Sequence, residues 1–331
     1  MKKKNYHSLK VFTNKQNSKN ATDIGLHTKK IDGLYDNDDF ISQEVEANAN
    51  KARLFSNPNI LVNANFQVNQ RQKSGYSSNA SSHIYTVDRW CFSKMAGSTC
   101  AIATNKITLK STGTARIDFF MQYVANPSFY SGKTVTLSVK YQNLTGKFGI
   151  GIRDGSVFSK TDWTTASSGT LVLTKTIQSS CTKLSCELLK ENATAISVEI
   201  LSAKLELGTV ATPFVQRTYD EDFQLCKPYF LRLKASSNYS IFATGISYSA
   251  TKAIFLVPHK MRAAPTLTTS GAIRVLNSTG YLACSSISQD GYSDAGVVVS
   301  CAGTNFAAGQ GALLSSFKDS VAYIDLDAEI K

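Results

Sequence analysis

The stretch that decides the fold lies at residues 133–141 and reads KTVTLSVKY. Apolar residues occupy every second position from Val135 to Tyr141, and hydroxyl groups and lysines occupy the positions between them. Successive side chains of a β-strand point to opposite faces of a sheet. The alternation therefore predicts a strand with one face in a core and the other toward solvent.

A second alternating stretch, residues 196–207, changes its parity midway. Apolar residues occupy even positions as far as Ile200 and odd positions from Ala203 onward, which predicts a β-bulge near Leu201. Shorter stretches of the same kind occur at 60–68, 107–110, 116–123, 148–153 and 170–176. Many short strands separated by polar turns predict a β-sandwich of the jelly-roll type over residues 57–217.

Composition agrees with a folded, mostly β protein of 331 residues. Apolar residues make up 42% of the chain and charged residues only 18%, so a core can form. No apolar run is long enough to cross a bilayer, so we expect no membrane insertion. No apolar stretch follows the basic first residues, so we expect no secretory signal.

The cysteines and histidines predict neither a metal site nor a cofactor. The seven cysteines are scattered without a C-x-x-C pair, and none of the four histidines is near a cysteine. We expect reduced, mostly buried thiols in a protein made in a cytosol.

The net charge of +12 is unevenly distributed along the chain. It amounts to +3 over residues 1–56, +9 over residues 57–217 and zero over residues 218–331. A basic middle segment indicates an anionic partner, such as an acidic glycan or an acidic protein, although a merely solvated basic surface is equally compatible. Nucleic acid is not expected, because the basic residues are dispersed and no recognition motif accompanies them.

Residues 1–56 are predicted to be an attachment region. Residues 1–36 read as a polar arm that orders against a partner, and a helix is expected from residue 38 to 55. An apolar stripe too thin to hold a lone helix in water recurs at spacings of three or four, at Ile41, Val45, Ala49, Ala52 and Phe55. We expect it to form a bundle with copies of itself, the alternative being that it lies across its own downstream domain.

Residues 218–331 are predicted to form a second, smaller β-sandwich. Asp220 is expected to cap a short helix that Pro228 ends, and the helix would separate the two β domains. Strands are expected beyond it, at 239–248, 253–257, 272–276, 295–301 and 320–326.

The search for a catalytic centre is negative. No serine, cysteine or carboxylate occurs in a recognised nucleophile motif near a histidine. Paired carboxylates could cleave a glycan, but the acids of the middle segment read as solvent-facing strand residues, namely Asp118, Asp154, Glu199 and Glu206. We therefore expect no enzyme, and a glycan-cleaving enzyme is the less favoured alternative.

Aromatic residues give better candidates for ligand binding, because sugar rings stack on aromatic faces. Trp163 lies in a polar run and is predicted to be an exposed loop residue, whereas Trp90, next to Cys91 and Phe92, reads as core. Tyr85 and Arg89 are further candidates. An ion pair between Asp88 and Arg89 that holds a loop is the alternative for the arginine.

Several motifs resemble a recurrent design of bacteriophage tail fibres and appendages. Residues 57–71 (NPNILVNANFQVNQR) and 85–90 (YTVDRW) resemble the opening of their carbohydrate-binding-module-like jelly rolls. Residues 203–208 (AKLELG), 211–214 (ATPF) and 219–229 resemble the end of that module and its exit helix. Residues 261–266 (MRAAPT) and 322–330 (AYIDLDAEI) resemble the small C-terminal β domain that often follows.

This resemblance implies a virion structural protein, commonly a trimer, made in the host bacterial cytoplasm. Its N-terminal part (1–56) would attach to other virion proteins. Its jelly roll (57–217) would bind host surface polysaccharide, and its C-terminal β domain (218–331) would trimerise or contact the receptor. The alternative is a purely structural head or tail adaptor that contacts only other virion proteins.

Overall fold

The computed structural model of the chain describes residues 56–94, 96–113 and 118–330. The chain divides into two units, Met1–Ser56 and Asn57–Lys331. The predicted arm, the predicted helix and its stripe from Ile41 to Phe55 lie outside the described residues. The fold described below is therefore that of the second unit.

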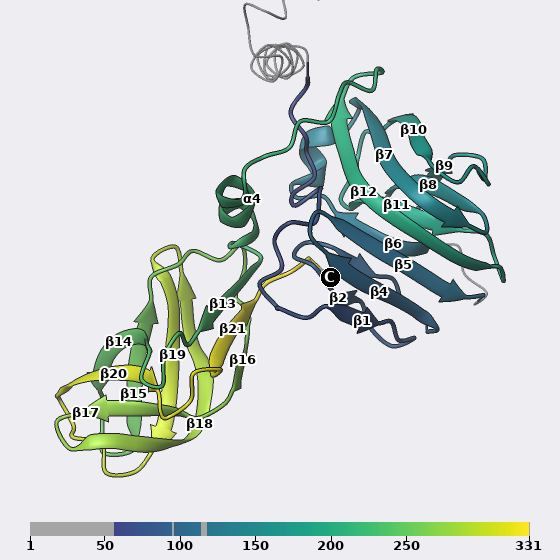
Figure 1. Cartoon of the computed structure of the whole chain (residues 1–331). Helices are drawn as coiled ribbons and strands as arrows, with labels where there is room; N and C mark the ends of the chain where they lie inside the picture. Colours follow the sequence, from purple (N-terminus) through teal and green to yellow (C-terminus); the bar gives the residue numbers. More distant parts are fainter. Residues whose placement is uncertain (1–55, 95, 114–117, 331) are drawn as a thin grey trace, which may run out of the picture. The chain divides into compact units, whose positions relative to one another are not determined.

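The first β module of this unit is a sandwich of two six-stranded antiparallel sheets (Figure 1). Sheet A contains, in spatial order, β1 (Gly75–Ser77), β4 (Ser98–Ala103), β5 (Lys106–Thr112), β12 (Ala195–Leu207), β7 (Thr134–Thr145) and β10 (Gly169–Thr176). Sheet B contains β2 (Ile84–Tyr85), β3 (Cys91–Phe92), β6 (Asp118–Tyr123), β11 (Leu184–Lys190), β8 (Phe148–Asp154) and β9 (Val157–Lys160). The predicted β-sandwich is confirmed.

The core of the sandwich follows the predicted alternation. The side chains of Val135, Leu137 and Val139 on β7 are buried between the sheets, as the period of two requires. Trp90 is also in this core, where its ring stacks on Phe120 at a centroid distance of 5.9 Å. The expectation that Trp90 is a core residue is confirmed.

A short helix follows the sandwich. Helix α4 (Tyr219–Cys226) lies within the predicted segment, but its N-cap is Thr218 and not Asp220. The Thr218 hydroxyl accepts a hydrogen bond from the Glu221 amide, and the Glu221 carboxylate accepts one from the Thr218 amide. This reciprocal capping box satisfies two amide groups, whereas Asp220 in the first turn interacts only with the helix dipole.

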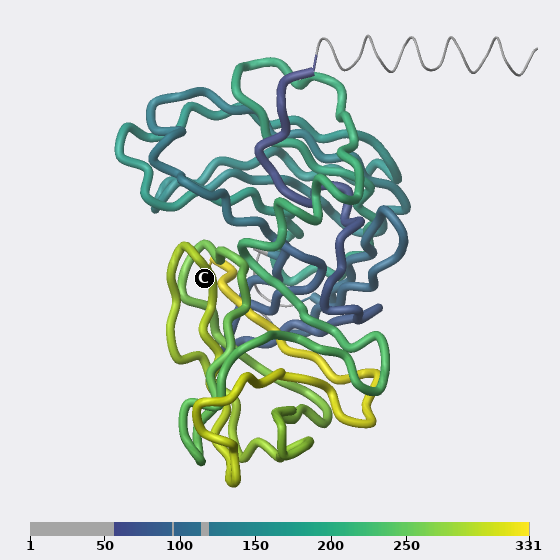
Figure 2. The backbone as a smooth tube through the Cα atoms, turned by 90° about the vertical axis from the view of Figure 1, so that its left-hand side faces the viewer, coloured from purple at the N-terminus to yellow at the C-terminus, as the bar shows by residue number. Residues whose placement is uncertain are grey.

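The second β module combines a three-stranded sheet with a closed six-stranded barrel. The sheet has the order β13 (Phe230–Lys234), β21 (Tyr323–Asp327) and β16 (Thr266–Ser270). The barrel has the order β14 (Ile241–Ser247), β15 (Lys252–Val257), β19 (Gly296–Gly303), β18 (Gly280–Ser293), β17 (Ile273–Asn277) and β20 (Gly311–Ser316). The last strand, yellow in Figure 2, returns to pair with β13 at the start of the module. The predicted mostly β fold is confirmed, and barrel closure removes the free edges that an open sheet would expose.

Candidate functional site

The outer face of sheet A carries a groove built from two rows of cross-strand neighbours. In each row a β10 residue pairs with a β7 residue, which pairs in turn with a β12 residue. The rows are Thr170–Lys140–Ser202 and Val172–Ser138–Lys204. Directly opposed residues of an antiparallel pair are close enough to contact one ligand together.

The bulge in β12 decides which side chains face this groove. The pairing register of β12 with β7 shifts between Ile200 and Ser202, as the parity change predicts. Before the shift the even residue Ile200 points into the core, and after it the odd residues Ala203 and Leu205 do so. Without the extra residue, the polar even positions would point into the core.

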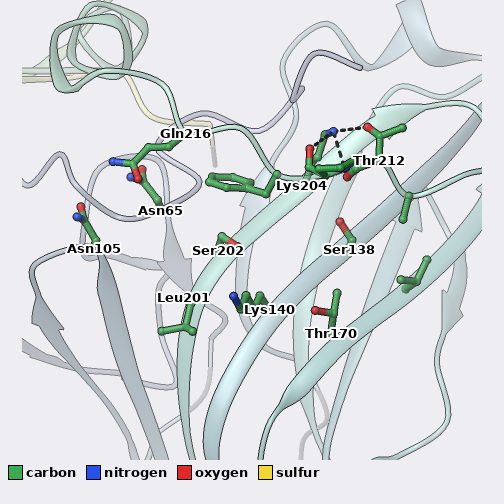
Figure 3. A pocket seen from close by; sticks show the side chains of 14 residues that line it. Asn65, Asn105, Ser138, Lys140, Thr170, Leu201, Ser202, Lys204, Thr212 and Gln216 are labelled. Atoms are coloured by element: carbon green, nitrogen blue, oxygen red, sulfur yellow. Dashed lines mark hydrogen bonds between the residues drawn. The ribbon is translucent and has the colours of Figure 1, made fainter. Parts of the chain in front are cut away.

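A loop after β12 forms one wall of the groove, and hydrogen bonds from Lys204 fasten it (Figure 3). The ammonium of Lys204 lies 3.2 Å from the Glu206 carboxylate and donates to the hydroxyl of Thr212 at 2.5 Å and the carbonyl of Pro213 at 3.0 Å. Glu206 in turn accepts a hydrogen bond from the Thr212 amide at 2.8 Å. Lys204 and Glu206 are thus scaffold residues, with their charges neutralised by each other.

Asn65 lies beside Gln216 on the opposite side of the groove in Figure 3. Its segment is held against β12, because the amide of Ala203 donates to the carbonyl of Ala64 at 2.9 Å. Asn65 is only 3% exposed as a residue, yet neither its amide nitrogen nor its oxygen has a hydrogen-bond partner among the described residues. A buried amide without partners costs free energy, and a polar ligand or water in the groove would supply them.

The groove has the size and chemistry of a polar ligand site. It encloses about 670 Å³, which is within the usual range for ligand pockets. Its lining, which lies wholly within the described residues, contains amides, hydroxyls, lysines and the ring of Phe214, but no Asp, Glu, His or Cys. Lys140 is exposed, and no described carboxylate lies within ion-pairing distance of it. The site can therefore hold hydroxyl groups and an anion.

Trp163 is located away from this groove, on the outer face of sheet B. Residues 161–164 lie along β8, where Thr164 exchanges two hydrogen bonds with Phe148. The Trp163 ring rests over Gly149 and is half-buried, with the Lys160 ammonium 4.6 Å from its centroid. Its role as a ligand residue remains a prediction.

Tyr85 and Arg89 are buried in contacts with the end of the chain. The Tyr85 hydroxyl donates to the carbonyl of Ile330, and an Arg89 nitrogen lies 2.5 Å from the Glu329 carboxylate. The side chain of Arg89 is 1% exposed and Tyr85 is 8% exposed as a residue, so neither lines an open surface. The expected pair between Asp88 and Arg89 is not formed, since Asp88 pairs with Arg71. Arg71 also lies 3.7 Å from Glu329, which links the two ion pairs.

The acids considered for catalysis are mostly not the solvent-facing strand residues that the sequence predicts. Asp154 is fully buried and lies 2.5 Å from the ammonium of Lys175. Glu206 is fully buried beneath the loop after β12. Only Glu199 is partly exposed, and hydrogen bonds from Gln142 and Lys106 lower its pKa. The side chain of Asp118 lies outside the description. A carboxylate with a salt-bridge partner and a lowered pKa is a poor proton donor.

Neither a metal site nor a membrane-crossing helix occurs in the part of the chain that the structure describes. No group of three or more His, Cys, Asp or Glu side chains is arranged there to hold a metal ion. No described helix is both long and apolar enough to span a bilayer.

No protein-family model and no curated protein sequence matches this chain. Many solved structures resemble part of it, among them the following three. One titled "CBM4 structure and function" is 16% identical over 44% of this chain and 98% of its own, with a TM-score of 0.29. The CBM22-1 xylan-binding domain from Paenibacillus barcinonensis is 11% identical over 47% and 98%, with a TM-score of 0.30. The enzymatically active domain of the bacteriophage CBA120 tailspike protein 4 is 10% identical over 45% and 21%, with a TM-score of 0.27. All three TM-scores are low, so the function rests on this chain's own residues.

Proposed function

We propose that this protein is a non-catalytic, glycan-binding component of a bacteriophage appendage, and that the groove on sheet A holds the glycan. The observation that carries the binding role is Asn65, a buried amide in the groove wall whose two polar atoms have no partner in the described part of the chain. Adjacent sugar hydroxyls donate and accept at once, which matches a carboxamide that offers both kinds of atom.

The charge of the groove favours an acidic glycan. Lys140 stands in the middle of its row, between Thr170 and Ser202, without a described carboxylate beside it. The segment 57–217 that contains it carries a net charge of +9. An ammonium flanked by hydroxyls would pair with a sugar carboxylate or phosphate, while the hydroxyls bind the ring substituents.

The virion role rests on the sequence resemblance of residues 57–331. In this proposal residues 1–56 attach the protein to the particle, and the stripe from Ile41 to Phe55 holds a homotrimer together. Replacing Ile41 and Val45 with Asp should then leave both β modules folded while light scattering shows a smaller assembly. An unchanged mass would mean that the stripe is not the assembly element.

The binding role is tested with the full chain against a panel of acidic and neutral bacterial surface polysaccharides. Saturable binding that weakens between about 50 and about 300 mM salt would support an anionic glycan. If the folded protein binds none of the panel, the proposal fails and the structural adaptor becomes the better account.

A further inference from the structure

A second aromatic cluster lies on the outer surface of the barrel, in the second β module. Tyr239, in the loop before β14, lies with its ring centroid 5.4 Å from that of Tyr281 on β18 and 5.9 Å from that of Phe317, which follows β20. Tyr281 and Phe317 are 5.1 Å apart, so all three rings are in mutual contact. Tyr239 is 46% exposed and the other two are partly exposed. The planes of Tyr239 and Tyr281 are inclined by 44°, and that of Phe317 by 80° and 51° to them. Three rings gathered at the surface rather than in the core form an aromatic platform, in which a single ring can offer its face to a flat apolar ligand.

Two cations lie over this aromatic platform. The Arg274 guanidinium lies 3.9 Å from the centroid of Phe317, and the Lys318 ammonium lies 5.5 Å from it. Arg274 points outward because its strand neighbours Ile273 and Val275 point into the barrel. Both positive charges are therefore directed to the surface that carries the rings.

Arg274 is unusual in having no carboxylate partner. Of the seven arginines among the described residues, five form ion pairs, namely Arg71, Arg89, Arg153, Arg217 and Arg232. Within the described ranges, the one hydrogen bond of the Arg274 guanidinium goes to the Tyr281 carbonyl, at 3.5 Å. The nearby acid Asp319 accepts hydrogen bonds from the Ala272 and Val321 amides instead. Arg274 thus keeps most of its donors for an external anion.

The loop that carries Tyr239 is held in place. The Ser240 hydroxyl accepts hydrogen bonds from the amides of Ser236 and Ser237, both at 2.9 Å. The Ser240 amide donates to the Ser316 hydroxyl at 2.8 Å, which ties the loop to the end of β20. The aromatic platform is therefore formed before a ligand arrives, which reduces the ordering cost of binding.

We infer that this aromatic platform is a second binding site, distinct from the groove on sheet A, and that it takes carboxylated sugars of an acidic polysaccharide. The sugar ring stacks on Tyr239, the most exposed of the three rings, and its carboxylate pairs with Arg274 and Lys318. Phe317 supports the guanidinium. This site would bind the same class of polymer as the groove, from the other β module.

The test uses hexagalacturonate as the probe and the full chain carrying Lys140→Ala, which reduces the contribution of the groove. Calorimetry should detect binding in this background, and the fully methyl-esterified hexamer, which has the same rings without charge, should bind at least about tenfold more weakly. Arg274→Gln and Tyr239→Ala should each lower the affinity by at least about tenfold. Tyr239→Phe, which keeps the ring, and Lys110→Gln, which removes an exposed lysine on β5, should change it by less than about threefold.

Thermal melts identify any variant that fails to fold. Tyr239→Ala and Arg274→Gln change different elements, so one of them can still test the inference if the other does not fold. Absence of binding in the Lys140→Ala chain would overturn the inference, as would equal binding of the methyl ester or full affinity in Arg274→Gln. If single-stranded oligothymidylate bound more tightly than hexagalacturonate, and Tyr239→Ala abolished that binding, the ligand of this site would be a nucleic acid and not a sugar. Whether the groove binds a glycan is tested separately, by the effect of Lys140→Ala on binding to the polysaccharide panel.

Discussion

An Arg89 nitrogen lies 2.5 Å from a carboxylate oxygen of Glu329, and both side chains are shielded from solvent. The pair joins residues 240 positions apart, at the start of the sandwich and at the end of the chain. Glu329 also accepts the Arg89 backbone amide at 3.1 Å, and the guanidinium stacks over Tyr229 at 3.6 Å. Residues 329 and 330 are thereby held against the sandwich.

Removing one member of this pair should destabilise the fold strongly, because the other charge stays buried and loses its nearest partner. Without Arg89, Glu329 keeps the more distant Arg71, at 3.7 Å. We expect Arg89→Met or Glu329→Ala to lower the free energy of unfolding by about 3–5 kcal/mol. The double variant should cost clearly less than the sum of the two single ones. Urea denaturation of the four proteins measures this, and strictly additive effects would show that the pair is not coupled.

Asp88 should make the protein less stable as the pH rises toward neutrality. It is fully buried, and this burial raises its pKa from 3.8 to about 7. Arg71 at 3.3 Å and a hydrogen bond from Gln70 lower the pKa, but by less than burial raises it, and the charge of the nearby Glu329 raises it further. Between those two values the folded protein holds a proton that the unfolded chain has released. The free energy of unfolding therefore falls by about 1.4 kcal/mol per pH unit across this interval.

The variant Asp88→Asn isolates this contribution. Urea denaturation at pH 5 and pH 8 should show a smaller difference in the variant than in the wild-type protein, because the titrating group is gone. The same pH dependence in both proteins would mean that Asp88 is ionised throughout.

The cysteines should differ sharply in reactivity. Burial raises the pKa of Cys91 and of Cys100 to about 12, so their thiolates are scarce and shielded. Cys284 is only half-buried, and a hydrogen bond with the thiol of Cys301 lowers its pKa. We expect one fast-reacting thiol with Ellman's reagent in the folded protein, lost in Cys284→Ser. A fast phase that survives this change would assign it to another cysteine.

Gly149 should determine the position of Trp163. A Cβ atom at residue 149 would lie 3.1 Å from two carbons of the indole ring, so Gly149→Ala must push the ring outward. We expect a red shift of the Trp163 fluorescence and a loss of about 1–3 kcal/mol of stability. The shift should be absent when Trp163→Phe is added, since Trp90 is then the only tryptophan left. Unchanged emission in Gly149→Ala would contradict the packing.

Local patterns predict strand β7 well because this strand has one buried face. They do less well elsewhere: residues 60–68 read as a strand but form bends and turns, and every residue of β11 is buried. The alternation at Val135, Leu137 and Val139 locates β7, and the parity change near Leu201 locates the bulge. The helix cap was mispredicted because Asp220 and Thr218 both suit an N-cap, and the reciprocal bond to Glu221 selects Thr218.

The groove is much less visible in the sequence than the strands. Lys140 and Ser138 belong to the polar side of the β7 alternation, and that pattern predicts an ordinary solvent-exposed face. This face lines a groove because β10 and β12 pair with β7 on either side. Asn65 comes from a segment far away in sequence, and its unpartnered amide is a tertiary property. Glu206 reads as exposed because nothing local reveals that Thr212 and Pro213 cover it.

The most direct test of glycan binding in the groove compares the affinities of three full-length proteins for the polysaccharide that the panel selects. These are the wild type, Lys140→Ala in the groove and Lys110→Ala, an exposed lysine on β5 that removes the same charge elsewhere. We predict that Lys140→Ala weakens binding at least about tenfold, while Lys110→Ala stays within about threefold of the wild type. Equal affinities of the two variants would show that the glycan does not bind in the groove.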